Sequence, residues 1–342
     1  MKDGTAYPEA VFHGGDLADA AEGPDGNRTP SKDWLDLSTG INPTPYPLPV
    51  FSPGDWTRLP GRHALASLLA AAQDYYASPD IINLTAGPGS QALIQALPGI
   101  LPDLPVTIVS PTYGGHAPAW EAAGKIITQK RDINDCDPAG ITVLVNPNNP
   151  DGRVIPKDQL EVFANEATRN GGWLIVDEAF GDLDPSFSAA EFCSNRTVVV
   201  LKSFGKFYGL AGVRLGFAIS PAAIAARLTQ RLGAWAISGP ALQIGEKALS
   251  DVNWQESQRS ALKVAATRLD DTLTAHGVSV IGGTSLFRLI EHDNAKSLYA
   301  HLLKHRIYVR HFPDHPSWLR LGLPGDESGW RRLGAALAEM PA

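Results

Sequence analysis

The sequence has 342 residues, a net charge of −7 and two cysteines. This length is enough for about two domains, and 44% hydrophobic with 19% charged residues is an ordinary globular composition. The acidic balance excludes binding to nucleic acid or anionic membrane through basic charge, and no apolar run is long enough to span a bilayer. Because two cysteines form no disulfide framework and the first residues lack the pattern of a signal peptide, we expect a cytoplasmic protein.

The first part of the chain is rich in proline, which disfavours regular structure. The prolines concerned are Pro43, Pro45, Pro47, Pro49 and Pro53. We expect residues 1–60 to form an arm that packs against the small domain or a partner subunit.

After the arm, helical stretches alternate with short, continuous apolar runs. Such runs are typical of strands buried on both faces, and the helices between them serve as crossover connections. The runs are residues 81–84, 106–110, 141–145, 173–177, 197–201 and 214–219. The pattern predicts a large, doubly wound α/β domain over residues 61–250. Long helices and short strands then predict a smaller α+β domain over residues 251–342.

Ligands bind at the carboxyl ends of strands in such a sheet. There, residues 85–93 place Gly89 directly before a helix that begins at Ser90, which is either a phosphate-binding turn or an ordinary tight turn. Residues 146–152 hold three asparagines, more than a series of β-turns requires.

Two further strand ends carry ionisable side chains. Asp177 and Glu178 close an apolar run, so either one of them faces a cation or the strand end is solvated. Lys206 lies in a loop between two apolar strands, where a lowered amine pKa would suit Schiff-base chemistry. A solvated lysine is the alternative for that position.

In combination these segments resemble the fold-type I enzymes that depend on pyridoxal 5′-phosphate (PLP), the aspartate aminotransferase superfamily. The matching motifs follow one another in the same order: the glycine-rich loop, NPDG, DEAF, SFGKFY and RLG. The resemblance covers essentially the whole chain. It implies a large domain with a mostly parallel seven-stranded sheet, a smaller C-terminal domain, an N-terminal arm, a homodimer and no metal.

The resemblance also implies roles for residues at matching positions. Lys206 would form the Schiff base with PLP and later move protons at the substrate Cα. Asp177 would pair with the pyridinium nitrogen and so keep the ring an electron sink. Asn149 would donate to the phenolic oxygen of the ring, and Tyr113 would stack on its face.

The remaining family positions concern anions. Gly89, Ser90, Ser203 and Arg214 would hold the phosphate of PLP, a dianion that suits a bidentate donor. Arg320 would hold the substrate carboxylate. Without the family motifs, both arginines would be interpreted as ordinary surface residues.

Two departures from the transaminase pattern narrow the family. Phe180 and Leu59 stand where transaminases usually have tyrosines. In addition, the segments HGGDL, LDLSTGINPTPYP, RLPG and DEAF resemble the threonine-phosphate decarboxylases of cobalamin biosynthesis. That resemblance implies conversion of L-threonine O-3-phosphate to (R)-1-amino-2-propanol phosphate and CO₂.

A decarboxylase must turn the carboxylate of its substrate out of the ring plane, and a grip on the distant phosphate would select that rotamer. His13, Gly40 and Asn42 are candidates for this grip, although an arm that is merely tied down would explain them equally. The alternative activity is that of histidinol-phosphate aminotransferase or a related transaminase. A non-catalytic regulatory subunit with the same fold is the more distant alternative.

Overall fold

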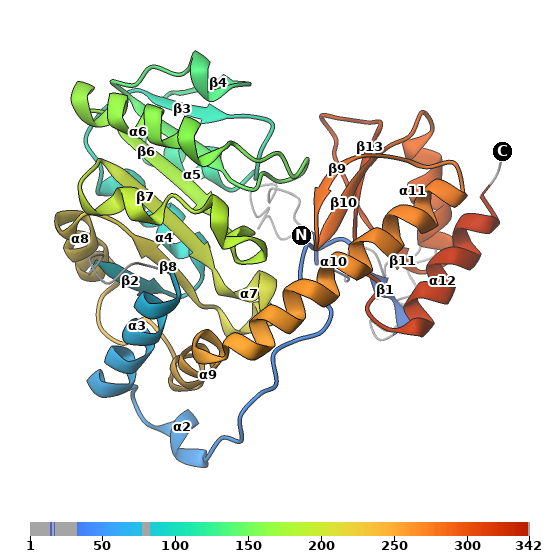
Figure 1. Ribbon diagram of the computed structural model, residues 1–342, viewed down its shortest axis with the longest axis horizontal. Coiled ribbons are helices and arrows are strands. Elements are labelled where there is room, and N and C mark those ends of the chain that lie inside the picture. Colours follow the sequence, from blue (N-terminus) through green and yellow to red (C-terminus); the bar gives the residue numbers. More distant parts are fainter. Residues whose placement is uncertain (1–13, 16, 18–32, 77–82, 341–342) are drawn as a thin grey trace, which may run out of the picture.

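The computed structural model describes residues 14, 15, 17, 33–76 and 83–340. It has two lobes, one around a seven-stranded sheet and one around a four-stranded sheet (Figure 1). We call them the large lobe and the small lobe. Among the described residues no helix is long and apolar enough to cross a membrane.

The seven-stranded sheet is mostly parallel, in the order β2-β8-β7-β6-β5-β3-β4. Only β8 runs antiparallel to its two neighbours, β2 and β7. The strands are β2 (Leu84–Gly87), β3 (Val106–Val109), β4 (Ile127–Lys130), β5 (Ile141–Val145), β6 (Trp173–Glu178), β7 (Val198–Ser203) and β8 (Gly216–Ile219). The predicted α/β fold with a mostly parallel sheet is thus confirmed.

Helices cover both faces of this sheet, as expected for strands that are apolar on both sides. One face packs against α4 (Ser90–Ala96), α5 (His116–Ala122) and α8 (Ala222–Leu232). The other packs against α3 (Arg62–Tyr76), α6 (Lys157–Asn170) and α9 (Gly239–Ser250). Successive side chains of one strand therefore enter two different cores.

The small lobe is built on an antiparallel sheet in the order β12-β13-β10-β9. Its strands are β9 (Ser279–Thr284), β10 (Phe287–Glu291), β12 (Arg310–His311) and β13 (Trp318–Gly322). The helices α11 (Ala295–Lys304) and α12 (Glu327–Ala338) pack beside it, and the long α10 (Val252–Ala275) runs from the large lobe to β9 and β10 (Figure 1). The predicted domain boundaries at residues 60 and 250 remain predictions.

The proline-rich arm contains more regular structure than its composition indicates. Strand β1 (Leu35–Asp36) pairs in parallel with β11 (Ile307–Tyr308) of the small lobe. Pro53 begins the helix α2 (Pro53–Thr57), so the prediction that this proline prevents regular structure is wrong. The reason is that proline at the first helical position sacrifices no intrahelical hydrogen bond.

Two further sequence expectations need correction. The first strand of the sheet, Leu84–Gly87, shares only Leu84 with the predicted run of residues 81–84 and extends three residues beyond it, because its pairing with β8 covers Leu84–Gly87; residues 81 and 82 of the run lie outside the described residues. The edge strand β4 was not predicted, since only Ile127 is even half-buried and no apolar run marks it.

Candidate active site

A cavity of about 720 Å³ lies between the two lobes. Its large-lobe wall consists of the carboxyl ends of parallel strands and the loops that follow them. Most of the predicted site residues line it: Gly40, Ser90, Tyr113, Asn149, Asp177, Ser203, Lys206, Arg214 and Arg320. The fold therefore brings together motifs that are far apart in the sequence.

Lys206 lies on the short helix α7 (Phe204–Phe207), which follows β7 directly. Its side chain lines the cavity, and its carbonyl oxygen accepts a hydrogen bond of 2.9 Å from the backbone N–H of Asn42. Burial, then the positive charges of Arg320 and Arg214, lower the pKa of the Lys206 amine to about 8. A large share of the amine is therefore neutral, and hence nucleophilic, near pH 8.

Asp177 is buried at the end of β6 and faces the cavity. Its Oδ2 lies 2.9 Å from Nε2 of His116, the first residue of α5, and its Oδ1 accepts from the N–H of Ala179 at 3.0 Å. Sequence reasoning missed His116, although it stands shortly after Tyr113 in the same loop. The histidine is a buried partner for a carboxylate that would otherwise be costly to bury.

The glycine-rich loop forms a tight contact with Arg214. Gly89 has a φ of 85°, and a Cβ there would lie 2.5 Å from Nη2 of Arg214. Only glycine thus permits the guanidinium to rest against the loop, at the start of α4. Arg214 itself has a φ of 54°, and its Nη1 donates to the carbonyl of Ala211 at 3.2 Å. Ser90 and Ser203 also line the cavity.

Arg320 reaches the cavity from β13 of the small lobe and is buried. Its Nη1 donates to Oδ1 of Asn149 in the large lobe, and its Nη2 donates to the carbonyl of Ser38 at 2.8 Å. Its Nε has no hydrogen-bond partner among the described residues. Burial and then the charge of Arg310 lower the pKa of Arg320 to about 10.

Arg310 is a second cationic residue of the cavity that sequence reasoning did not single out. It lies on β12 directly opposite Arg320 on β13, and both residues line the cavity. Like charges opposite each other destabilise a sheet, so this pairing is favourable when an anion lies between them. Arg310 stands in the short apolar run IYVRH, where a cation is unusual, but only the pairing of the strands places the two arginines together.

Of the residues predicted to hold the substrate phosphate, one lines the cavity, one does not, and one lies outside the described residues. Gly40 lines the cavity, and a Cβ there would lie 2.9 Å from the ring of Phe287 and 3.0 Å from that of Phe180. Asn42 does not line it; its amide donates to the carbonyl of Phe207 at 2.7 Å and accepts from Gln258 at 3.1 Å. This arrangement is that of a tied-down arm.

His13 lies outside the described residues, whereas its neighbour Gly14 lines the cavity.

The two positions that lack the transaminase tyrosines also differ. Phe180 lines the cavity and packs edge-on against Phe287, with ring centroids 5.1 Å apart. Leu59 is exposed and does not line the cavity.

Comparison with known proteins agrees with this geometry. The family model for aminotransferase class I and II matches residues 32–337. The chain belongs to this family. The fold is similar to that of a solved structure, the histidinol-phosphate aminotransferase of Clostridium acetobutylicum. The TM-score is 0.77, with 23% sequence identity, and the match covers 89% of this chain and 98% of that chain.

Two relatives are more similar in sequence, and both are named threonine-phosphate decarboxylase. The protein from a Sinorhizobium species is 42% identical over 96% of this chain and 98% of its own length. The protein from Pseudomonas aeruginosa is 43% identical over 95% of this chain and 96% of its own length. This member of the aminotransferase class I and II family therefore resembles decarboxylases over nearly its full length.

Proposed function

We propose that the protein is a PLP-dependent decarboxylase that converts L-threonine O-3-phosphate to (R)-1-amino-2-propanol phosphate and CO₂. The similarity in sequence to two threonine-phosphate decarboxylases supports the reaction class. The observation that carries the substrate is the pair Arg310 and Arg320, because two cations in one cavity suit a substrate with two anionic ends.

The residues of the large-lobe wall fit PLP. The backbone of Gly89 and Ser90, the Ser203 hydroxyl and the Arg214 guanidinium would hold its phosphate, because donors and a fixed cation converge there. Asp177 would accept from the ring nitrogen, and its contact with His116 leaves the carboxylate fixed in direction.

On the remaining sides of the ring, Tyr113 would lie against its face and Asn149 would donate to its phenolic oxygen.

When bound, PLP supplies an electron sink for the electron pair left at the substrate Cα. Lys206 would hold the cofactor covalently and then, once the substrate has displaced its amine, deliver a proton to Cα. The lowered pKa of this amine suits both tasks near neutral pH. Asp177 would keep the ring nitrogen protonated by remaining an anion beside it.

The small-lobe wall would orient the substrate. Arg320 would bind the carboxylate, using the guanidinium edge whose Nε has no partner among the described residues. Arg310 would bind the phosphate at the other end, with the loop of residues 312–315 enclosing it. Fixing both ends would restrict rotation about the Cα bonds and would select the rotamer from which the carboxylate is lost rather than the proton.

A substrate test distinguishes this proposal from a transaminase. The protein is incubated with threonine phosphate and PLP, with and without a 2-oxo acid. We expect CO₂ and aminopropanol phosphate in both reactions, with little pyridoxamine phosphate. Stoichiometric pyridoxamine phosphate without CO₂ would show that the activity is transamination.

We also propose that the protein is a cytoplasmic homodimer. Several large apolar side chains are exposed on the arm, on α2 and next to α9: Leu48, Val50, Trp56, Leu59 and Trp235. An exposed apolar set of this kind marks an interaction surface, and a second copy of the chain would cover it. Light scattering tests the oligomeric state: we expect the mass of a dimer for the wild type and that of a monomer for the double variant Trp56→Asp with Trp235→Asp.

A further inference from the structure

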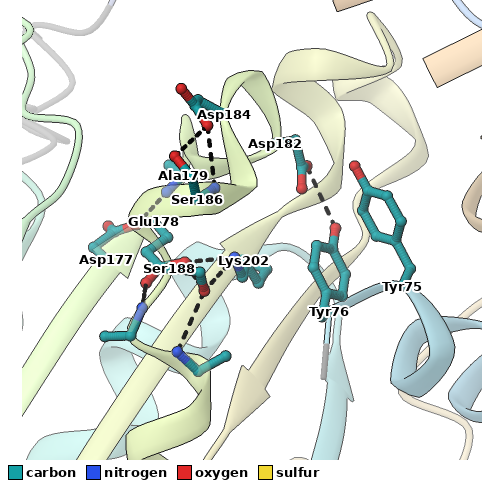
Figure 2. A network of polar contacts seen from close by, with 12 residues as sticks. Tyr75, Tyr76, Asp177, Glu178, Ala179, Asp182, Asp184, Ser186, Ser188 and Lys202 are labelled. Carbon is teal, nitrogen blue, oxygen red and sulfur yellow. Dashed lines mark hydrogen bonds and ion pairs between the residues drawn. The ribbon is translucent and has the colours of Figure 1, made fainter. Parts of the chain in front are cut away.

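A buried ion pair joins the ends of the two strands that carry Asp177 and Ser203. Glu178 is the last residue of β6, Lys202 is the penultimate residue of β7, and the two are direct neighbours in the parallel pairing. Glu178 is 1% exposed and Lys202 is 3% exposed. Their side chains form a direct ion pair (Figure 2).

The ion pair lies on the opposite face of the sheet from the cavity. Side chains alternate along a strand, so Asp177 points toward α5 and the cavity while Glu178 points toward α3. Lys202 lies with its Nζ 5.0 Å from the ring centre of Tyr76 on α3, whereas Ser203 lines the cavity. Neither Glu178 nor Lys202 lines the cavity, so neither is placed to touch a molecule bound there.

The pair also holds the loop that follows β6. Glu178 accepts from the hydroxyl of Ser188 and from the N–H of Ala189, both at 2.7 Å, and Lys202 donates to the same hydroxyl at 3.2 Å (Figure 2). Gly181 passes so close that a Cβ there would lie 3.0 Å from Cβ of Glu178. The loop is thus wrapped around the ion pair, with Phe180 at its start facing the cavity.

We propose that Glu178 and Lys202 are positioning residues, which fix Asp177, Phe180 and Ser203 at the cavity by clamping their chain neighbours from behind. This inference rests on the proposed PLP site, since two of the three clamped residues are its proposed ligands. A ligand site needs such support, because a small misplacement of its contacts weakens binding.

A merely stabilising role predicts something different. Replacing a buried ion pair by uncharged residues of similar volume often leaves stability unchanged, whereas removing one partner is costly. The double variant Glu178→Gln with Lys202→Met therefore separates folding from positioning. It removes both charges and keeps most of the side-chain volume.

The decisive measurement is the dissociation constant of PLP, titrated against apoprotein in the absence of substrate. For the double variant we expect it to rise about tenfold, comparable to the loss that removal of a supporting residue causes at metal sites. Thermal melting of the apoprotein should stay close to that of the wild type. Lys202→Arg, which keeps the charge, should bind PLP within about twofold of the wild type.

The matched control is Asp270→Asn, which removes the ion pair of Asp270 with Arg288 in the small lobe, away from the cavity. It should leave PLP binding unchanged. A folded double variant with wild-type affinity, or an equal loss in the control, overturns the proposal.

If the double variant does not fold, Ser188→Ala replaces it, since it removes one hydrogen bond from each partner of the pair. We then expect PLP binding to weaken about threefold, and unchanged binding overturns the proposal. None of these titrations involves threonine phosphate, so their outcome is independent of which reaction the protein catalyses.

Discussion

The two walls of the cavity are built on different principles. The large-lobe wall consists of the ends of parallel strands and the turns after them, where backbone groups, Asp177 and Lys206 are held by the sheet itself. The small-lobe wall consists of two antiparallel strands that place Arg310 opposite Arg320. One wall therefore offers contacts for a cofactor, and the other offers two cations for a substrate.

This difference teaches that the two walls divide the work: the proposed cofactor ligands lie mainly on one wall and the proposed substrate cations on the other, with Arg320 as the link because its charge also acts on Lys206. The walls are in direct contact where Arg320 donates to Asn149. Variants of one wall should mainly affect cofactor attachment and turnover, and variants of the other should mainly affect substrate binding. The following predictions test that division, from the largest expected effect to the smallest.

Lys206→Ala should abolish covalent attachment of PLP and all turnover, because no other described lysine lines the cavity. Borohydride reduction of the wild type followed by peptide mapping should place the label on Lys206. The control Lys125→Ala removes an amine that lies outside the cavity, paired with Asp103, and should change neither result. A label on Lys202 would contradict the assignment.

Asp177→Asn should lower kcat about 10²- to 10³-fold while most of the PLP stays bound, since the phosphate contacts are untouched and only the charge beside the ring nitrogen is lost. Steady-state kinetics and a PLP titration measure the two effects separately. The control is Asp184→Asn, at the N-cap of the short helix Pro185–Phe187 outside the cavity, which should change neither value. A kcat near the wild-type value would remove Asp177 from this role.

Arg320→Lys should raise the KM for threonine phosphate about tenfold and leave PLP affinity nearly unchanged. Lysine keeps the charge but loses the planar pair of donors that suits a carboxylate. Arg288→Lys, in the neighbouring strand and outside the cavity, should leave KM unchanged. Weaker PLP binding with an unchanged KM would show that the division between the walls is wrong.

The rate of PLP attachment to apoprotein should rise with pH and be half-maximal near pH 8. Only the neutral amine attacks an aldehyde, and burial together with Arg320 and Arg214 lowers the pKa of Lys206 to about 8. Arg320→Gln removes one of these cations, so the midpoint should move to higher pH. Rapid-mixing absorbance measures it, and a wild-type midpoint near that of a free lysine, about 10.4, would refute the assigned environment.

The large-lobe wall could be predicted in detail because its residues are tied to strand ends. A continuous apolar run identifies the strand, and a cavity-lining residue such as Asp177 or Lys206 lies at or just after its end. Local sequence therefore fixes both the element and the position of the side chain along it. His116 could not be predicted in the same way, because its contact with Asp177 joins two different βα units that are far apart in the sequence.

The sequence by itself determined the doubly wound fold, the family and the cavity-lining residues of the motifs, since each depends on patterns within a short stretch of chain. Tertiary structure alone decided which cations meet. Arg310 faces Arg320 only through antiparallel pairing, and Lys202 was assigned to Glu178 and not to the cavity by the alternation of side chains on adjacent strands. These contacts depend on register between distant segments, which no local pattern specifies.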